Sequence, residues 1–162
     1  MTCCSVRTRR NLAAASILLA AACGNSTPSP TAIDKAVITL NTNPNPIPAV
    51  VSNRVGTAFS AAYKVVVTET AGQGAQVQAL NSTLYDDVTG VVVGIVNYDS
   101  ADLKVFVGED RVEANGTLEV PIQVDYVIPS DPTLKAAHLQ VLVNLKDDKG
   151  NAITSSILVK VE

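Results

Sequence analysis

The alternation of apolar and polar residues along 118–128 constrains the fold of this chain more than any other feature. Every second residue there is apolar: Leu118, Val120, Ile122, Val124, Tyr126 and Ile128. A period of two is that of a β-strand with one buried and one exposed face. Pro121 lies on the other parity and predicts an edge strand or a bulge, because proline cannot donate a ladder hydrogen bond.

Similar patterns recur along the chain between turn signals, as in sandwiches whose strands repeat at intervals of roughly ten residues. The turn signals lie at 71–74, 86–90, 97–101 and 147–151, and 108–116 is polar enough to be a loop. We expect the apolar run 91–96 to be buried on both faces or interrupted at Gly94. The expected strands cover 35–41, 57–70, 76–85, 91–96, 103–107, 118–128, 139–146 and a last segment ending at 161.

These patterns predict an all-β fold, a single antiparallel immunoglobulin-like β-sandwich of about eight or nine strands over 34–162. Valine dominates the apolar residues, aromatic residues are few, and no helical window after the first 22 residues is convincing. The last two strands and their turn 147–151 resemble the closing hairpin of immunoglobulin-like and fibronectin-type domains. The segments NPNPIP and TETAGQG are similar to those of immunoglobulin-like domains in bacterial envelope proteins, which implies a fold and no function. The chain lacks the core tryptophan and the disulfide of antibody domains, and an up-and-down barrel remains the alternative.

The N-terminus has the three-part layout of a secretory signal peptide. Three arginines (Arg7, Arg9 and Arg10) precede the apolar run Leu12–Ala22, and Cys23 follows it. The run is eleven residues long, whereas a membrane-spanning helix needs about 20. Residues 24–33 are rich in serine, threonine and proline, which predicts a flexible linker.

The tetrapeptide Ala20-Ala21-Ala22-Cys23 resembles the lipobox of bacterial lipoproteins, although Ala20 stands where that motif usually has leucine. The resemblance implies transfer of a diacylglyceryl group to the Cys23 sulfur, cleavage between Ala22 and Cys23, and acylation of the new amino group. Two or three acyl chains hold a protein on a membrane, whereas one does so only reversibly. In Gram-negative lipoproteins, Gly24 in place of aspartate points to the outer membrane. The alternative is an ordinary signal peptide cleaved after Ala22.

This interpretation divides the chain into a signal peptide (1–22), a lipidated cysteine with its linker (23–33) and the domain 34–162. Since Cys3, Cys4 and Cys23 are the three cysteines, the domain has none with which to form a disulfide. Removing 1–22 removes three of twelve basic residues and none of fifteen acidic ones, so the formal charge becomes 9 − 15 = −6. An acidic surface argues against nucleic acid as a partner.

The sequence predicts neither a catalytic site nor a metal site, and no cofactor. His138 is the one histidine, its parity is opposite to that of Leu139 and Val141, and no G-x-S-x-G motif is present. Carboxylates gather at 86–87, 99–102, 109–113 and 147–148, where calcium or a small hydrolase or carbohydrate-active site is an alternative to simple turn residues.

The remaining signal is at the strand edges. Val50-Val51 and Val91–Val93 could add a strand from a partner, although the prolines of 44–48 favour edges that block such pairing. We therefore expect a non-enzymatic lipoprotein of the bacterial cell envelope, held on the membrane through Cys23, that binds another envelope protein or a surface ligand. The alternative is a structural spacer or an accessory subunit of an outer-membrane assembly.

Overall fold

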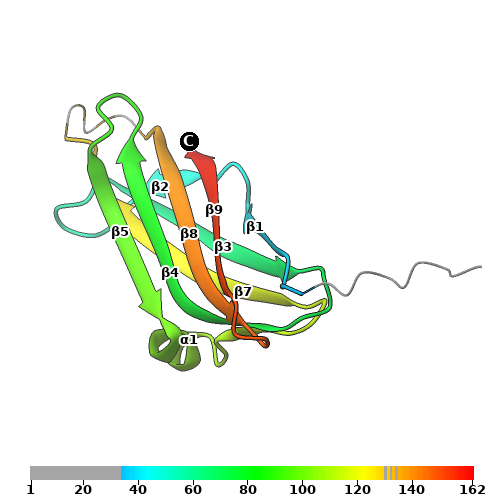
Figure 1. Ribbon diagram of the computed structural model, residues 1–162. Helices are drawn as coiled ribbons and strands as arrows, with labels where there is room; N and C mark the ends of the chain where they lie inside the picture. The colour runs from blue at the N-terminus through cyan, green and yellow to red at the C-terminus, as the bar shows by residue number, and fades with distance from the viewer. Residues whose placement is uncertain (1–33, 130, 132, 134) are drawn as a thin grey trace, which may run out of the picture. The chain divides into compact units, whose positions relative to one another are not determined.

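The computed structural model describes residues 34–129, 131, 133 and 135–162. Within these residues, nine strands and one short helix form a β-sandwich of two antiparallel sheets (Figure 1), which confirms the predicted fold class. In chain order, the elements are β1 (Ile38–Asn43), β2 (Ala49–Val51), β3 (Phe59–Glu69), β4 (Ala75–Asp86), β5 (Val92–Asp99), α1 (Ser100–Phe106), β6 (Arg111–Val112), β7 (Thr117–Tyr126), β8 (Ala137–Asp147) and β9 (Ala152–Val161).

The four-stranded sheet, called sheet A here, has β3 at its centre. β1 and β2 pair with successive parts of one side of β3, and β7 pairs with its other side. The alternation predicted for 57–70 and 118–128 is confirmed, because the apolar parity of both strands is buried. Pro121 lies in β7 at the edge of this sheet, as its sequence predicted.

The five-stranded sheet, sheet B, has the order β5-β4-β8-β9, with the short β6 also pairing with β4. β8 and β9 form the predicted hairpin around the turn 147–151, where the Asp147 N–H donates to the Asn151 carbonyl at 3.0 Å. Gly150 has a φ of 89°, a left-handed conformation that glycine adopts without steric cost.

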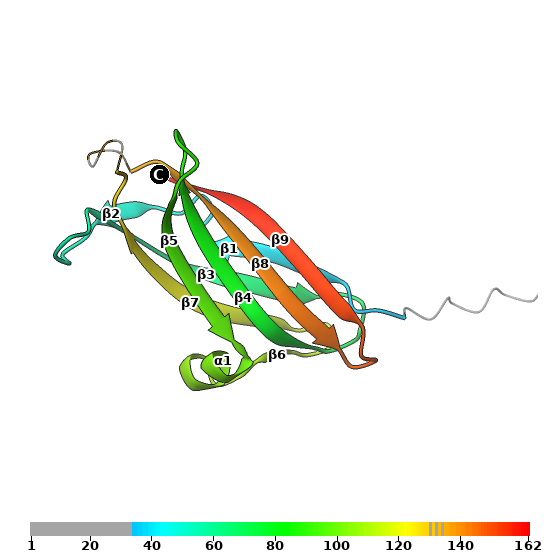
Figure 2. The ribbon, with the colours of Figure 1, turned by 60° about the vertical axis from the view of Figure 1, so that its left-hand side comes forward.

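The two sheets pack face to face around one apolar core (Figure 2). Valine and leucine side chains from β3 and β7 meet those from β4 and β8, and complete burial of one such side chain contributes about 1.5–3 kcal/mol. Ile47, which precedes β2, and Ala49 at the start of β2 close one side of the sandwich. There the Ile47 N–H donates to the Lys160 carbonyl of β9 at 2.9 Å, and the Ala49 N–H donates to the Glu162 carbonyl at 2.8 Å.

The structure corrects the prediction for 97–107, which was a turn followed by a strand. β5 continues to Asp99, and 100–106 forms α1. The helix begins with a reciprocal capping box, in which the Asp102 N–H donates to Asp99 Oδ1 at 2.8 Å and the Asp99 N–H donates to Asp102 Oδ2 at 3.1 Å. This pair satisfies two N–H groups that a helix start otherwise leaves without partners. Leu103 is its one buried residue, so the segment has little apolar periodicity from which to predict a helix.

The prediction that 91–96 is buried on both faces is wrong. β5 is the outermost strand of sheet B, and Val92 and Ile95 are exposed. Gly94 does not interrupt the strand; it faces the core side, where a Cβ would lie 2.5 Å from Val124 Cγ1 of β7. The glycine therefore allows β5 to pass close to sheet A.

Across the part of the chain described, no helix is both long and apolar enough to cross a membrane. The predicted signal peptide, the cleavage site at Ala22 and Cys23, and the linker lie outside the described residues.

Candidate functional site

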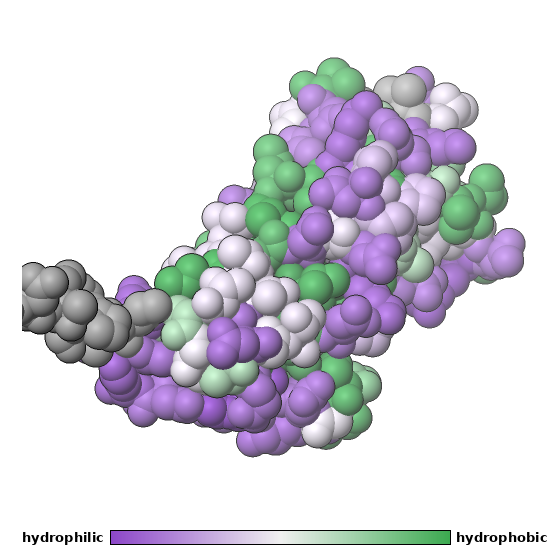
Figure 3. Space-filling model, turned by 90° about the vertical axis from the view of Figure 1, so that its right-hand side faces the viewer, coloured by the Kyte–Doolittle hydropathy of each residue, from purple (hydrophilic) through white to green (hydrophobic). Residues whose placement is uncertain are grey.

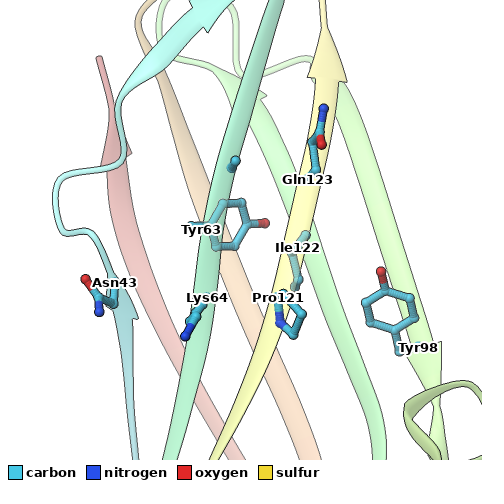
Figure 4. A pocket seen from close by; sticks show the side chains of 8 residues that line it. Asn43, Tyr63, Lys64, Tyr98, Pro121, Ile122 and Gln123 are labelled. Carbon is cyan, nitrogen blue, oxygen red and sulfur yellow. The ribbon is translucent and has the colours of Figure 1, made fainter. Parts of the chain in front are cut away.

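Two neighbouring hollows lie beside Gln123 of β7 at the outer face of sheet A, and the larger one extends to Tyr98 of β5 in sheet B. The larger has a volume of about 610 Å³. Figure 4 shows Lys64 on β3, Pro121 and Gln123 on β7, Asn43 on one side and Tyr98 on the other. Ala62 lies opposite Gln123 in the β3–β7 register, and its small side chain helps to leave the hollow open.

The second hollow, of about 250 Å³, lies between β2, β3 and β7. Val50 and Val51 expose 57% and 73% of their surfaces there. Gln123 Nε2 donates to Ser60 Oγ at 3.0 Å, and Arg54 pairs with Asp125 at 3.0 Å. Exposed apolar groups thus lie beside polar groups that are already oriented by their neighbours.

This face is from here called the Gln123 surface. It presents amides, hydroxyls, exposed valines and one lysine, whose Nζ lies 2.7 Å from Glu119 Oε2. Both partners of this ion pair are about half exposed, so its contribution to stability is small. Protein interfaces commonly combine a small apolar area with such a polar rim.

His138 lies on the outer face of sheet B, as its parity predicted. Its Nδ1 is 2.7 Å from Asp87 Oδ1, and its ring stacks on that of Tyr85 with centroids 5.2 Å apart. The neighbours of His138 in the strand register are Tyr85 and Lys160, neither of which is a serine, threonine or cysteine. The structure therefore brings together a histidine and a carboxylate, and no hydroxyl or thiol nucleophile comes from the residues paired with His138 in the sheet.

The turn carboxylates bind the protein itself. Asp86 accepts from the Val88 N–H and from Thr89 Oγ1, and Arg111 lies between Glu113 and Asp148 at 3.0 and 2.6 Å. Among the residues described, no group of three or more histidine, cysteine, aspartate or glutamate side chains could hold a metal ion. The acidic clusters near α1 stabilise local turns and the helix start.

Asp110 is the most strongly perturbed of these carboxylates. Burial alone would raise its pKa, but hydrogen bonds from Gln76, Ser100 and Lys104 outweigh burial and lower the pKa of Asp110 to about 2. A carboxylate with so low a pKa is a weak general base for the Ser100 hydroxyl. This cluster fixes the β4–α1–β6 corner.

The sequence indicated only part of the Gln123 surface. It singled out Val50 and Val51 as an exposed edge, and it did not indicate Ala62 or Gln123. These two residues are recognised only from the pairing of β3 with β7, which places them opposite each other. The alternation within each strand does not give this pairing.

No family model and no curated protein matches this chain. Two solved structures are similar in fold. One is a structural-genomics target determined by X-ray crystallography, with 10% identity over 78% of this chain and 85% of that chain and a TM-score of 0.54. The other is a Bordetella pertussis protein described as ApaA, with 17% identity over 76% of this chain and 93% of that chain and a TM-score of 0.52. At such identities the likeness shows the fold alone, and it agrees with the two-sheet β-sandwich described above.

Proposed function

We propose that this protein is a lipid-anchored, non-enzymatic interaction module of the bacterial cell envelope, and that the Gln123 surface contacts its partner. The partner is another envelope protein or a surface ligand, and the anchor is the acylated Cys23. The observation that carries the proposal is the placement of two neighbouring hollows beside Gln123, the smaller of which is lined by the exposed Val50 and Val51. The acidic composition favours a protein or neutral ligand over nucleic acid.

Other features support this proposal over a hydrolase. Asp110 and Asp147 accept several internal hydrogen bonds, and His138 pairs with Asp87 away from the Gln123 surface. The rims of the hollows hold Lys64 and Arg54, each already paired with an acidic side chain. Such a surface can bind by shape and hydrogen bonding, and it offers no pair of free carboxylates for acid–base chemistry.

The test is site-specific photo-crosslinking in intact cells. A photo-reactive residue replaces Ala62, which is exposed at the larger hollow, and the matched control replaces Gln140, which is exposed on the outer face of sheet B. We expect a discrete adduct from position 62 and none from position 140, and we expect Gln123→Ala to weaken the adduct. Equal adducts from both positions would contradict the proposed surface. The absence of adducts at both would instead favour a structural spacer.

A further inference from the structure

The sandwich has four outermost strand edges, and three of them are protected over part of their length. The C-terminal end of the β9 edge is covered by Ile47 and Ala49, whose N–H groups donate to the carbonyls of Lys160 and Glu162. The β1–β2 edge is interrupted by the prolines of 44–48, and β7 carries Pro121, which removes one donor from its backbone. Covering an edge or placing proline on it are the usual ways in which proteins prevent strand addition.

The β5 edge has none of these protections. The strand is eight residues long, and among the described residues its strand pairing is with β4. It contains no proline, and its first charged residue is Asp99 at its end. A long uncharged edge with open backbone donors and acceptors is a template for another strand.

Exposed apolar side chains gather along the same edge. Eleven large apolar residues are exposed in the described part of the chain, and six of them lie in or beside β5 and α1. Phe106 of α1 packs against Tyr98 of β5 with ring centroids 5.6 Å apart, so the helix end extends this apolar edge. The six residues are Val88, Val91, Val92, Ile95, Val105 and Phe106.

We propose that a second copy of this chain covers the edge, with the two β5 strands antiparallel about a two-fold axis at Ile95. The pairing would join the two copies of sheet B into one continuous sheet. Ile95 would lie opposite its own counterpart on the outer face, where it is 56% exposed in the single chain. Cross-strand apolar pairs at this spacing each contribute a few tenths of a kcal/mol to about 1 kcal/mol.

The residues of β5 are complementary to themselves in this arrangement. Gly94 lies opposite Val96, so a position without a side chain faces a branched one. Tyr98 lies opposite Val92, which places Phe106 near the exposed valines at the start of the other strand. A parallel alignment would instead bring the two Asp99 carboxylates to the same end, where like charges repel. The antiparallel two-fold pairing separates these charges. The match of β5 with itself, in which Gly94 faces Val96, is the reason why we assign a copy of the chain as the occupant.

The test compares Ile95→Lys with Leu158→Lys in the full chain. Leu158 is a matched control, because the register across sheet B places it in the same row as Ile95, at the opposite edge, and it is also exposed. Sedimentation over a concentration series should show self-association of the parent chain. Ile95→Lys should weaken this association at least tenfold, and Leu158→Lys should leave it unchanged. Circular dichroism of each variant checks that the fold is retained.

A second test introduces a cysteine at Ile95, the residue on the proposed two-fold axis. Directly paired antiparallel residues have Cα atoms about 4.5–5.5 Å apart, within the range that a disulfide spans. Ile95→Cys should therefore form disulfide-linked dimers on mild oxidation, and Leu158→Cys should not, each in a background with Cys3, Cys4 and Cys23 replaced by serine. A parent chain that stays monomeric at all concentrations, or equal cross-linking of both cysteine variants, would overturn the proposal. If the Ile95→Lys variant still gives the photo-crosslinked adduct from position 62, the β5 interface and the Gln123 surface are two different contact areas.

Discussion

Glu69 of β3 and Asp147 of β8 accept hydrogen bonds from the N–H groups of two consecutive residues. The Ala36 N–H donates to Asp147 Oδ2 and the Val37 N–H donates to Glu69 Oε1, each at 3.2 Å. Both carboxylates are buried, and they belong to different sheets. The segment that leads into β1 is therefore fixed to both layers of the sandwich, at the point where the proposed linker would meet the domain.

Replacing Glu69 with glutamine should destabilise the domain by about 1–3 kcal/mol, the usual cost of leaving buried donors without an acceptor. The Glu69 carboxylate also accepts from the N–H groups of residues 71, 72, 73 and 115, and an amide cannot accept all of these bonds. Urea unfolding measures the change. Glu119→Gln is the control, because its ion pair is exposed and its loss should change the free energy of unfolding by less than about 0.5 kcal/mol. Equal effects of the two substitutions would contradict a stabilising role for the hydrogen bonds that Glu69 accepts.

Asp110 should make stability depend on pH in the acid range. Its pKa is about 2 in the folded chain against 3.8 as the ordinary value, so the unfolded state binds its proton first as the pH falls. The stabilisation from Asp110 is complete above about pH 4 and is lost as the pH falls towards 2. Urea unfolding over this range should show a smaller pH dependence in Asp110→Asn than in the parent chain. If the pH dependence of the free energy of unfolding were the same in both chains, the pKa of Asp110 would not be lowered in the folded state.

Tyr63 and Ser82 should couple the two sheets. Tyr63 comes from β3 and Ser82 from β4, their hydroxyl oxygens are 2.5 Å apart, and burial raises the pKa of Tyr63 to about 12. Tyr63→Phe leaves the buried Ser82 hydroxyl without this partner and should cost about 1–3 kcal/mol. Adding Ser82→Ala should recover much of that loss, because the unpaired hydroxyl is then gone. Additive effects in the double-mutant cycle would contradict a direct interaction.

Gly94→Ala should destabilise the domain by about 1–3 kcal/mol through overpacking against Val124. The cost should fall sharply in a Val124→Ala background, where the added methyl group has room. Thermal unfolding of the four chains measures this coupling. If Gly94→Ala were stabilising in the parent chain, as alanine for glycine is in an unstrained strand, β5 would not lie so close to β7.

The strands with one buried face could be predicted from the sequence because their side chains alternate strictly. The alternation along β3, β7 and β8 predicts which residues are buried, and the structure confirms this prediction. The burial of Glu69 could not be predicted, since two of the donors that compensate it are distant in sequence: Val37 lies just before β1, and Asn115 lies in a loop more than forty residues away.

For β5 the sequence left two alternatives open, burial on both faces and an edge that could add a strand from a partner. A continuous apolar run is compatible with a strand buried on both faces and with an edge that binds another chain, and only the strand order distinguishes them. The Gln123 surface depends in the same way on register between β3 and β7. The lipid anchor at Cys23 rests on local sequence alone and stays a prediction.

Metabolic labelling with a radioactive fatty acid tests the proposed anchor most directly. The parent chain should incorporate the label and fractionate with membranes, whereas Cys23→Ser should lose the label and leave the membrane fraction. Cys4→Ser is the control, and we expect it to keep both properties because the acyl group is proposed for Cys23. Unchanged labelling and membrane fractionation in the Cys23→Ser chain would contradict the lipid-anchored module.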